Sequence, residues 1–259
     1  MYNTLAELKT QEFENIEKTY NDISSKLRDI GEIRFYKVFG VAYLAYLAKV
    51  NKLETAKELS DYVAEQLPIE QGLFLKESVN NSWSMVIEIS GAYSAATLLA
   101  AVLWMQPSNG KAEGESGTPD SIINLATKIL DVQKEKVADF CCGVGNFLVN
   151  AVGQDSSSNY YGIELNTQSK EIAEIRLHLL SDEIKIDLGT VFDIVADQKF
   201  DKIFCDYPWS VPKNSTWISE EKMSKFDAII PEMQRLQKSD WLFIMNVMQH
   251  LNEDGKAVV

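Results

Sequence analysis

The sequence predicts an α/β protein with a doubly wound parallel sheet, preceded by an all-helical region. Apolar residues recur at helical spacing through residues 1–105, and a segment rich in Gly, Pro and Ser interrupts this pattern near residues 106–120. Beyond it, short apolar runs alternate with helical segments. That alternation is typical of parallel strands joined by right-handed crossovers, whose ligands bind beyond the carboxyl ends of the strands.

The first region carries apolar residues such as Leu5, Leu8, Phe13 and Ile16 at spacings of three to five. We therefore predict a helical domain over residues 1–105, a linker over 106–117 and a second domain over 118–259. The uncharged run Ile89–Met105 has 17 residues, fewer than the roughly 20 that a membrane span needs. It predicts a buried core helix and no membrane segment.

Composition narrows the class of protein. With 46% hydrophobic and 24% charged residues, the chain has the profile of an ordinary globular protein, which excludes disordered and collagen-like classes. A net charge of -13 argues against a surface that binds nucleic acid broadly by itself. Cys141, Cys142 and Cys205 show no CxxC spacing, and the charged N-terminus is unlike a signal peptide. These features predict a reduced, cytoplasmic protein, and no metal site is expected.

Five strands are expected in the second domain, and the last of them is short. Thr118 is expected to cap a helix through residues 121–130, with Pro119 in its first turn. Gly255 is expected to end the last helix, leaving only four residues for the final strand and an open sheet edge. Either the chain is part of a longer subunit, or a partner covers that edge. The predicted strands are Val137–Cys141, Tyr160–Glu164, Ile184–Leu188, Lys202–Cys205 and Lys256–Val259, and the predicted helices between them are 146–153, 167–181 and 239–251.

The segment "VADFCCGVGNFLVNA" (137–151) combines a strand, a glycine-bearing turn and a helix start. Gly143 and Gly145 allow a tight turn and close approach of the backbone to a ligand. A dinucleotide fingerprint would need a third glycine where Leu148 stands, which disfavours a dehydrogenase. Glu164 follows Gly143 by about 20 residues at the end of the next strand, where a carboxylate can accept both ribose hydroxyls. A ligand with a ribose but no pyrophosphate fits, and S-adenosyl-L-methionine is the common one. The alternatives are an ordinary strand-to-helix turn and a solvated acid.

The segment "FCDYPWS" (204–210) ends an apolar strand with an acid and two large aromatic residues around a proline. Asp and Pro are common where a strand gives way to a turn, so Asp206 as a turn cap and Trp209 as a core aromatic is the structural alternative.

Taken together and in this order, "SGTPDSIINLATKIL", "DFCCGVGNFLVNA", "YGIELN" and "FDKIFCDYPWS" resemble the adenine-N6 DNA methyltransferases, most closely the modification subunits of type I restriction-modification systems. The likeness covers residues 115–259, and the helical region matches those subunits in position and character only. Against the family pattern D-P-x-C-G-S/T-G-G-F, the departures are Phe140, Val144 and Asn146. The matching residues are Asp139, Cys142, Gly143, Gly145 and Phe147.

The resemblance implies an S-adenosyl-L-methionine site built from the first three motifs. In the family, the Thr-Pro and the glycine motif hold the methionine end, and the acid after the second strand holds the ribose. A third motif, "LGTVFDI", has Thr190 where an acid is expected, so Phe192 or Asp193 would serve the adenine. The predicted cofactor-binding residues are Thr118, Pro119, Asp139, Phe140, Cys141, Gly143, Gly145, Phe147, Glu164, Leu165, Phe192 and Asp193.

The fourth family motif is N/D-P-P-F/Y/W, and "DYPW" matches three of its four positions, with Tyr207 in place of a proline. Asp206 and the Tyr207 carbonyl would accept hydrogen bonds from the adenine amine, Pro208 would complete the turn, and Trp209 would stack on a base flipped from the duplex. The amine would thereby become more nucleophilic toward the sulfonium methyl. Tyrosine at position 207 leaves the backbone less rigid than proline would.

The resemblance also implies partners. DNA would be the substrate, recognised through a separate specificity subunit, with a restriction subunit as a further partner, and the helical domain would serve assembly or DNA clamping. Two alternatives stay open from the sequence. One is a methyltransferase that acts on RNA or protein, and the other is a non-catalytic assembly module, which the motif departures and the short last strand would explain.

Overall fold

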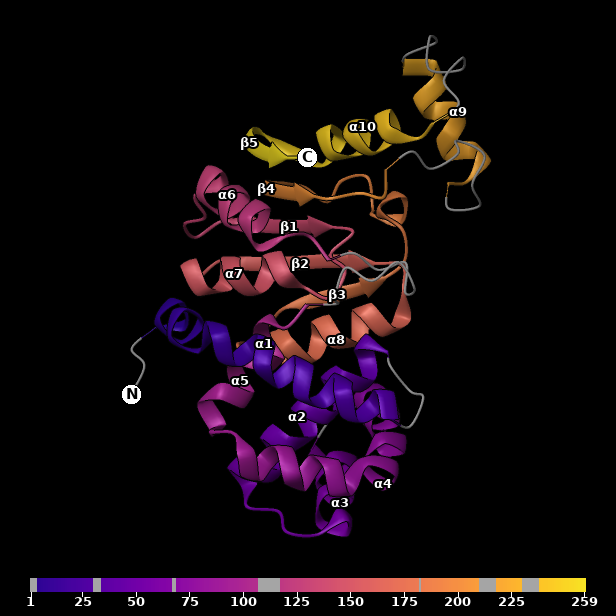
Figure 1. The fold of residues 1–259 in the computed structure, drawn as a ribbon. Coiled ribbons are helices and arrows are strands. Elements are labelled where there is room, and N and C mark those ends of the chain that lie inside the picture. Colours follow the sequence, from indigo (N-terminus) through magenta and orange to yellow (C-terminus); the bar gives the residue numbers. More distant parts are fainter. Residues whose placement is uncertain are drawn as a thin grey trace. The chain divides into compact units, whose positions relative to one another are not determined.

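A computed structural model describes residues 4–29, 34–66, 69–106, 117–181, 183–209, 218–229 and 238–259. The chain divides into two compact units, Met1–Gly117 and Thr118–Val259 (Figure 1). Most of the linker predicted over residues 106–117 lies outside the described residues.

The first unit is all-helical, as the periodicity predicts. Its most apolar long helix is α2, which is buried over most of its length and packs against both α4 and α5. Within α2, rings four residues apart lie together, with Phe39 and Tyr43 centroids 6.3 Å apart. The helices are α1 (Leu5–Asp29), α2 (Phe35–Asn51), α3 (Ala56–Gln66), α4 (Ile69–Ala92) and α5 (Ala95–Trp104).

The prediction of one core helix over Ile89–Met105 is wrong. The run is divided between α4, which ends at Ala92, and α5, which begins at Ala95. Ser94 caps α5, because its hydroxyl accepts the backbone N–H of Thr97 at 3.0 Å. Within the described part of the chain, no single helix has the length and apolar character needed to cross a membrane, although Asn81–Ala92 and α5 pass that test as a pair bent by 117°.

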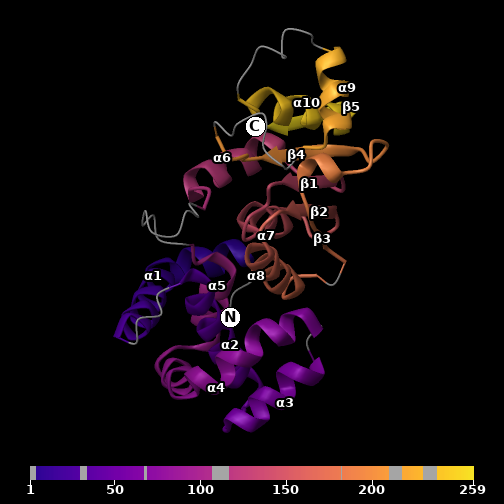
Figure 2. The same ribbon diagram turned by 90° about the vertical axis from the view of Figure 1, so that its right-hand side faces the viewer.

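The second unit is a parallel five-stranded sheet in the order β3-β2-β1-β4-β5, which can be followed in Figure 2. The predicted doubly wound architecture is confirmed, and the first four strands begin within two residues of their predicted positions. The strands are β1 (Lys136–Phe140), β2 (Asn159–Glu164), β3 (Lys185–Leu188), β4 (Phe200–Cys205) and β5 (Leu251–Val258). The helices are α6 (Asp120–Leu130), α7 (Asn146–Gln154), α8 (Thr167–His178), η1 (Val191–Asp193), α9 (Glu220–Ile229) and α10 (Asp240–His250).

The last strand differs from its prediction. β5 has eight residues and begins directly after α10, so Gly255 lies inside the strand and does not terminate the helix. A Cβ at Gly255 would lie 2.9 Å from a Leu251 methyl and 3.0 Å from the Asn252 carbonyl, closer than side chains tolerate. Glycine is therefore required there by close packing where β5 bulges out of register with β4.

The side chains of the sheet alternate between two packed faces. On one face, Phe140 of β1 packs with Phe200 of β4, with ring centroids 5.9 Å apart, in a core completed by η1, α9 and α10. On the other, Phe204 stacks on Phe147 of α7 at 4.6 Å, and α7 lies beside α6 and α8 (Figure 1). Burial on both faces explains why β1, β2 and β4 are mostly apolar.

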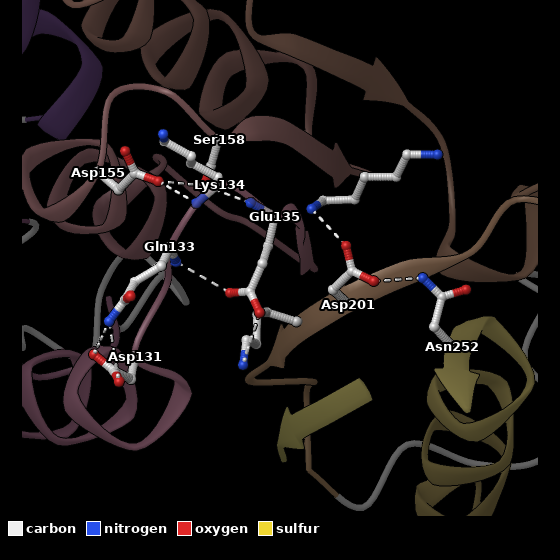
Figure 3. Close-up of polar contacts among 10 residues, drawn as sticks. Asp131, Gln133, Lys134, Glu135, Asp155, Ser158, Asp201 and Asn252 are labelled. Carbon is white, nitrogen blue, oxygen red and sulfur yellow. Dashed lines mark hydrogen bonds and ion pairs between the residues drawn. The ribbon is translucent and has the colours of Figure 1, made fainter. Parts of the chain in front are cut away.

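Polar side chains fix the amino end of the sheet (Figure 3). Three successive amides at the start of β1 each donate to a side chain: Lys134 N–H to Asp155, Glu135 N–H to Ser158 and Lys136 N–H to Asp201. The other Asp201 oxygen accepts from the Asn252 amide at 2.6 Å. Because these acceptors come from the loop before β2 and from β4, the contacts help to fix the register of β1 with its two neighbouring strands.

Candidate functional site

The glycine turn, Glu164 and Asp206 lie at the carboxyl ends of β1, β2 and β4, which are neighbours in the sheet. After β1 the chain continues to β2 and then β3 on one side, whereas β4 lies on the other side of β1. The loops that follow β1 and β4 therefore diverge, and this switch point is where open α/β sheets bind ligands.

The glycine turn, residues 141–145, leaves β1 with a left-handed backbone at three positions. The φ angles are 67° at Cys141, 53° at Gly143 and 82° at Gly145. A Cβ on Gly143 would meet nothing within 4 Å, whereas one on Gly145 would lie 3.1 Å from the Ala173 Cβ of α8. Gly145 is thus needed for packing against α8, while Gly143 leaves open space beside the backbone.

Glu164 ties this turn to the end of β2. Its Oε2 accepts the Gly143 N–H at 2.8 Å, and its Oε1 accepts the Asn166 N–H at 2.8 Å. The Cys142 N–H also donates to the Ile163 carbonyl at 3.0 Å, which continues the pairing of β1 with β2 into the turn. Since each carboxylate oxygen has a second lone pair, the partly exposed Glu164 can still accept from a ligand.

Asp139 is a buried acid without compensation. It is 2% exposed, and its Oδ1 has no hydrogen-bond partner among the described residues. Burial raises the pKa of this carboxyl, and the neighbouring carboxylates of Asp206 and Glu164 raise it further. Three acids thus surround the glycine turn, an arrangement that a cationic ligand would stabilise. Burial and the charges of Asp139 and Glu164 likewise raise the pKa of the Cys142 thiol.

Asp206 stands directly after β4 and is bound by Thr118. The Thr118 hydroxyl donates to Asp206 Oδ2 at 2.6 Å. The prediction that Thr118 caps α6 is therefore wrong: the helix begins at Asp120 with Pro119 in the cap position, and no side chain caps it. The Thr-Pro segment instead positions the acid of the fourth motif.

An aromatic stack positions the rest of the tetrapeptide DYPW (206–209). The Tyr207 ring lies face to face with Phe243 of α10, with centroids 4.7 Å apart and an angle of 6° between the planes. Tyr207 also stacks with Trp209, with ring centroids 6.2 Å apart and 22° between the planes. Trp209 is 80% exposed, so it is not a core aromatic. Tyr207 thus gains from ring stacking part of the rigidity that a proline would have supplied.

The remaining predicted residues lie around these motifs in different settings. Phe192 is buried in the core against Phe243, and Asp193 closes a capping box in which its carboxylate accepts the Thr190 N–H at 2.8 Å. Phe140 is fully buried within β1, Phe147 is buried at the start of α7, and Leu165 and Pro119 are exposed.

Sequence patterns did not reveal two side chains that hold the glycine turn. Arg176 of α8, which is fully buried, donates to the Val144 carbonyl at 3.0 Å and to Asn146 Oδ1 at 2.7 Å. A single arginine within a helix carries no recognisable signal. The only hint was Asn146 itself, which departs from the family pattern.

Comparison with known proteins identifies the family of this chain. The sequence model of the N-6 DNA Methylase family matches residues 102–259. The chain belongs to this family. A type I restriction enzyme methylase subunit from Methanocaldococcus jannaschii is 25% identical over 169 residues, 57% of this chain, and the chain spans 28% of that subunit's length.

Two solved structures described as methyltransferases are similar to this chain to different degrees. A candidate class I S-adenosylmethionine-dependent methyltransferase from Listeria monocytogenes superimposes with a TM-score of 0.56 at 16% identity, over 95% of this chain and 72% of the other. A methyltransferase from Thiobacillus denitrificans, in complex with S-adenosyl-L-homocysteine, has a TM-score of 0.36 at 19% identity, over 54% of this chain and 47% of its own. The likeness to the L. monocytogenes structure confirms the predicted fold of this chain.

Proposed function

We propose that this chain transfers a methyl group from S-adenosyl-L-methionine to the exocyclic amine of adenine in DNA, as part of the modification subunit of a type I restriction-modification system. The observation that carries the proposal is the juxtaposition of the acidic glycine turn with Asp206. Asp139, Glu164 and Asp206 lie close enough to shift the Asp139 pKa, and Asp206 begins the tetrapeptide that would receive the base.

The residues present suit this cofactor. S-adenosyl-L-methionine carries a positive sulfonium and ammonium, and the unpartnered Oδ1 of Asp139 supplies a buried acceptor for such a cation. Glu164 stands at the end of β2, where it would accept the ribose hydroxyls. The open space beside Gly143 allows close approach of a ligand to the backbone.

The tetrapeptide would hold the base. The adenine amine is a weak nucleophile because its lone pair is delocalised into the ring. Thr118 holds Oδ2 of Asp206, and we propose that Oδ1 and the Tyr207 carbonyl accept the two amine protons. The Trp209 ring, which is highly exposed, would stack on a flipped base, a contact worth about 1–3 kcal/mol per base.

Bound S-adenosyl-L-methionine would supply an electrophilic methyl carbon, whose bond to sulfur would break as the bond to nitrogen formed. Asp206 would pull on an amine proton through its hydrogen bond, which raises the electron density on the nitrogen, and would orient the amine; the surplus proton leaves to water. Positioning of this kind supplies much of the acceleration in reactions between two bound groups. We therefore propose Asp206, the carbonyl of Tyr207 and Trp209 as the catalytic groups, with Pro208 as part of the turn that holds them.

A specificity partner is part of the proposal, because a chain of net charge -13 is poorly suited to finding a DNA sequence unaided. We propose that a separate specificity subunit delivers the DNA, and that the helical unit serves assembly. The M. jannaschii relative, described as a methylase subunit, supports this assignment.

Two measurements test the proposal. Calorimetric titration with S-adenosyl-L-methionine should show binding that Glu164→Ala weakens, and a labelled-methyl assay with a specificity partner should place label on DNA adenine. Absence of binding at millimolar ligand would contradict the methyltransferase assignment. Label found only in RNA or only in protein would overturn the DNA substrate.

A further inference from the structure

The buried guanidinium of Arg176 requires an explanation, because taking a charge out of water costs several kcal/mol unless it is well paired. Arg176 is fully buried at the end of α8, and burial lowers its pKa to about 9, so that it stays charged at neutral pH. The function proposed above assigns it no role.

Two of its contacts are on the glycine turn. One guanidinium nitrogen, Nη1, donates to both the Val144 carbonyl at 3.0 Å and Asn146 Oδ1 at 2.7 Å. These two acceptors flank Gly145, whose backbone is left-handed at φ 82°. Three residues before Arg176, on the same face of α8, Ala173 packs where a Cβ on Gly145 would lie. Helix α8 therefore contacts residues 144, 145 and 146, where the turn passes into α7.

Asn146 supplies this contact through a departure from the family pattern. It stands where the family pattern has glycine, and it is 6% exposed as the first residue of α7. A glycine there would offer no side-chain oxygen, so the guanidinium would lose one of its acceptors. The departure from the pattern thus coincides with a partner for the buried charge.

The Arg176 charge also interacts with residues 118–120, the segment that includes the Asp206 partner Thr118. The Asp120 carboxylate lies close enough to raise the Arg176 pKa against the effect of burial. Asp120 begins α6 two residues after Thr118, which donates to Asp206. The same cation thus interacts with the glycine turn and with the first residue of α6.

We infer that Arg176 and Asn146 form a positioning pair that holds the glycine turn in the conformation that binds the methionine end of S-adenosyl-L-methionine. The inference rests on the proposed function for the identity of the cofactor. It makes Arg176 a positioning residue, since it would act through the backbone of residues 144–146 and not by touching the ligand.

The test is calorimetry on the full chain with two probes, S-adenosyl-L-homocysteine and adenosine, which lacks the amino-acid part. Asn146→Ala removes the acceptor, and we expect it to weaken S-adenosyl-L-homocysteine binding about tenfold, because hydrogen bonds to charged groups are worth more than neutral ones. Adenosine affinity should stay within about twofold. Asn146→Asp keeps an acceptor for Arg176 and should retain most of the affinity.

A double-mutant cycle separates the pair from two independent effects. Arg176→Met alone should weaken S-adenosyl-L-homocysteine binding about as much as Asn146→Ala does. The double variant should bind no more weakly than the single variant with the lower affinity. Lys185→Met, which removes an exposed cation from the same unit, is the matched control and should change neither affinity. If Arg176→Met does not fold, the contrast between Asn146→Ala and Asn146→Asp still decides.

Three outcomes would overturn the inference. One is unchanged S-adenosyl-L-homocysteine affinity in folded Asn146→Ala. Another is equal weakening of both probes, which would mean that the pair supports the fold as a whole. The third is absence of binding by the unaltered chain, which would overturn the proposed function as well and is distinguished from the other two by that control measurement.

Discussion

At the amino end of the sheet, Asp155 and Asp201 each accept hydrogen bonds from backbone amides at the start of β1, whereas at the carboxyl end Asp139 is buried with an unpartnered oxygen. The pKa values follow this difference. Hydrogen bonds lower the pKa of Asp155 and of Asp201, while burial and like charges raise that of Asp139. Asp155 and Asp201 stabilise the sheet, whereas Asp139 lowers stability and, under the proposed function, would be compensated by a ligand.

The two ends of β4 provide the strongest test of this contrast. Asp206→Ala should lower methyl transfer, reconstituted with a specificity partner, by about 10²–10³-fold, the effect of removing one preorganised polar group at other catalytic sites. Cofactor affinity should persist. Asp201→Ala is the control at the opposite end of the strand: it should lower the unfolding temperature but leave the rate per folded molecule unchanged. Equal loss of methyl transfer and cofactor binding in Asp206→Ala would mean that Asp206 is structural.

Asp139→Asn should trade stability for binding. The substitution removes a buried charge, so the unfolding midpoint should rise, and the gain should grow as pH increases above the ordinary aspartate pKa of about 3.9. The sign follows from the raised pKa: the folded state holds the proton longer than the unfolded state does, so the unaltered chain loses stability with pH in that window.

The same substitution, Asp139→Asn, should raise stability but weaken cofactor binding. A cationic ligand favours the charged carboxylate, so S-adenosyl-L-methionine affinity of the unaltered chain should increase with pH, and Asp139→Asn should be weaker by about 10–100-fold with no such dependence. Calorimetry from pH 5 to pH 8 measures this. A destabilised variant with full affinity would show that the acid belongs with those of the amino end.

The tetrapeptide depends on a stack that can be removed in steps. Tyr207→Ala should lower the rate of methyl transfer by about two- to tenfold, since aromatic pairs contribute about 0.5–1.5 kcal/mol beyond burial. Tyr207→Phe keeps the ring on Phe243 and should stay near the unaltered rate. If both variants lose activity alike, the hydroxyl and not the stack is what matters.

The sequence was sufficient to predict the first four strands, because those signals are local, whereas the start of β5 was missed. Alternation of apolar runs with helices predicted the parallel sheet, and the position of Glu164 after the second strand followed from it. Contacts between distant segments could not be predicted. Thr118 and Asp206 are 88 residues apart, and a Thr-Pro pair looks like a helix cap until the fold brings Asp206 to it. Tyrosine at position 207 was expected to leave the backbone less rigid than proline would. The stacking of Tyr207 on Phe243, which restores part of that rigidity, could not be predicted because nothing in the sequence pairs these two residues.

Asp155 should give the smallest effect on function and so completes the contrast. Its carboxylate accepts from the Lys134 N–H and from Ser157, which holds its pKa below the ordinary value. A depressed pKa contributes stability that is present above about pH 4 and lost as pH falls through the folded pKa. Asp155→Asn should therefore lower the unfolding midpoint at pH 7 and approach the unaltered chain in strong acid, with cofactor affinity unchanged throughout. Thermal unfolding from pH 2 to pH 8 checks this, and a loss of cofactor affinity in the folded variant would show that the two ends of the sheet are coupled.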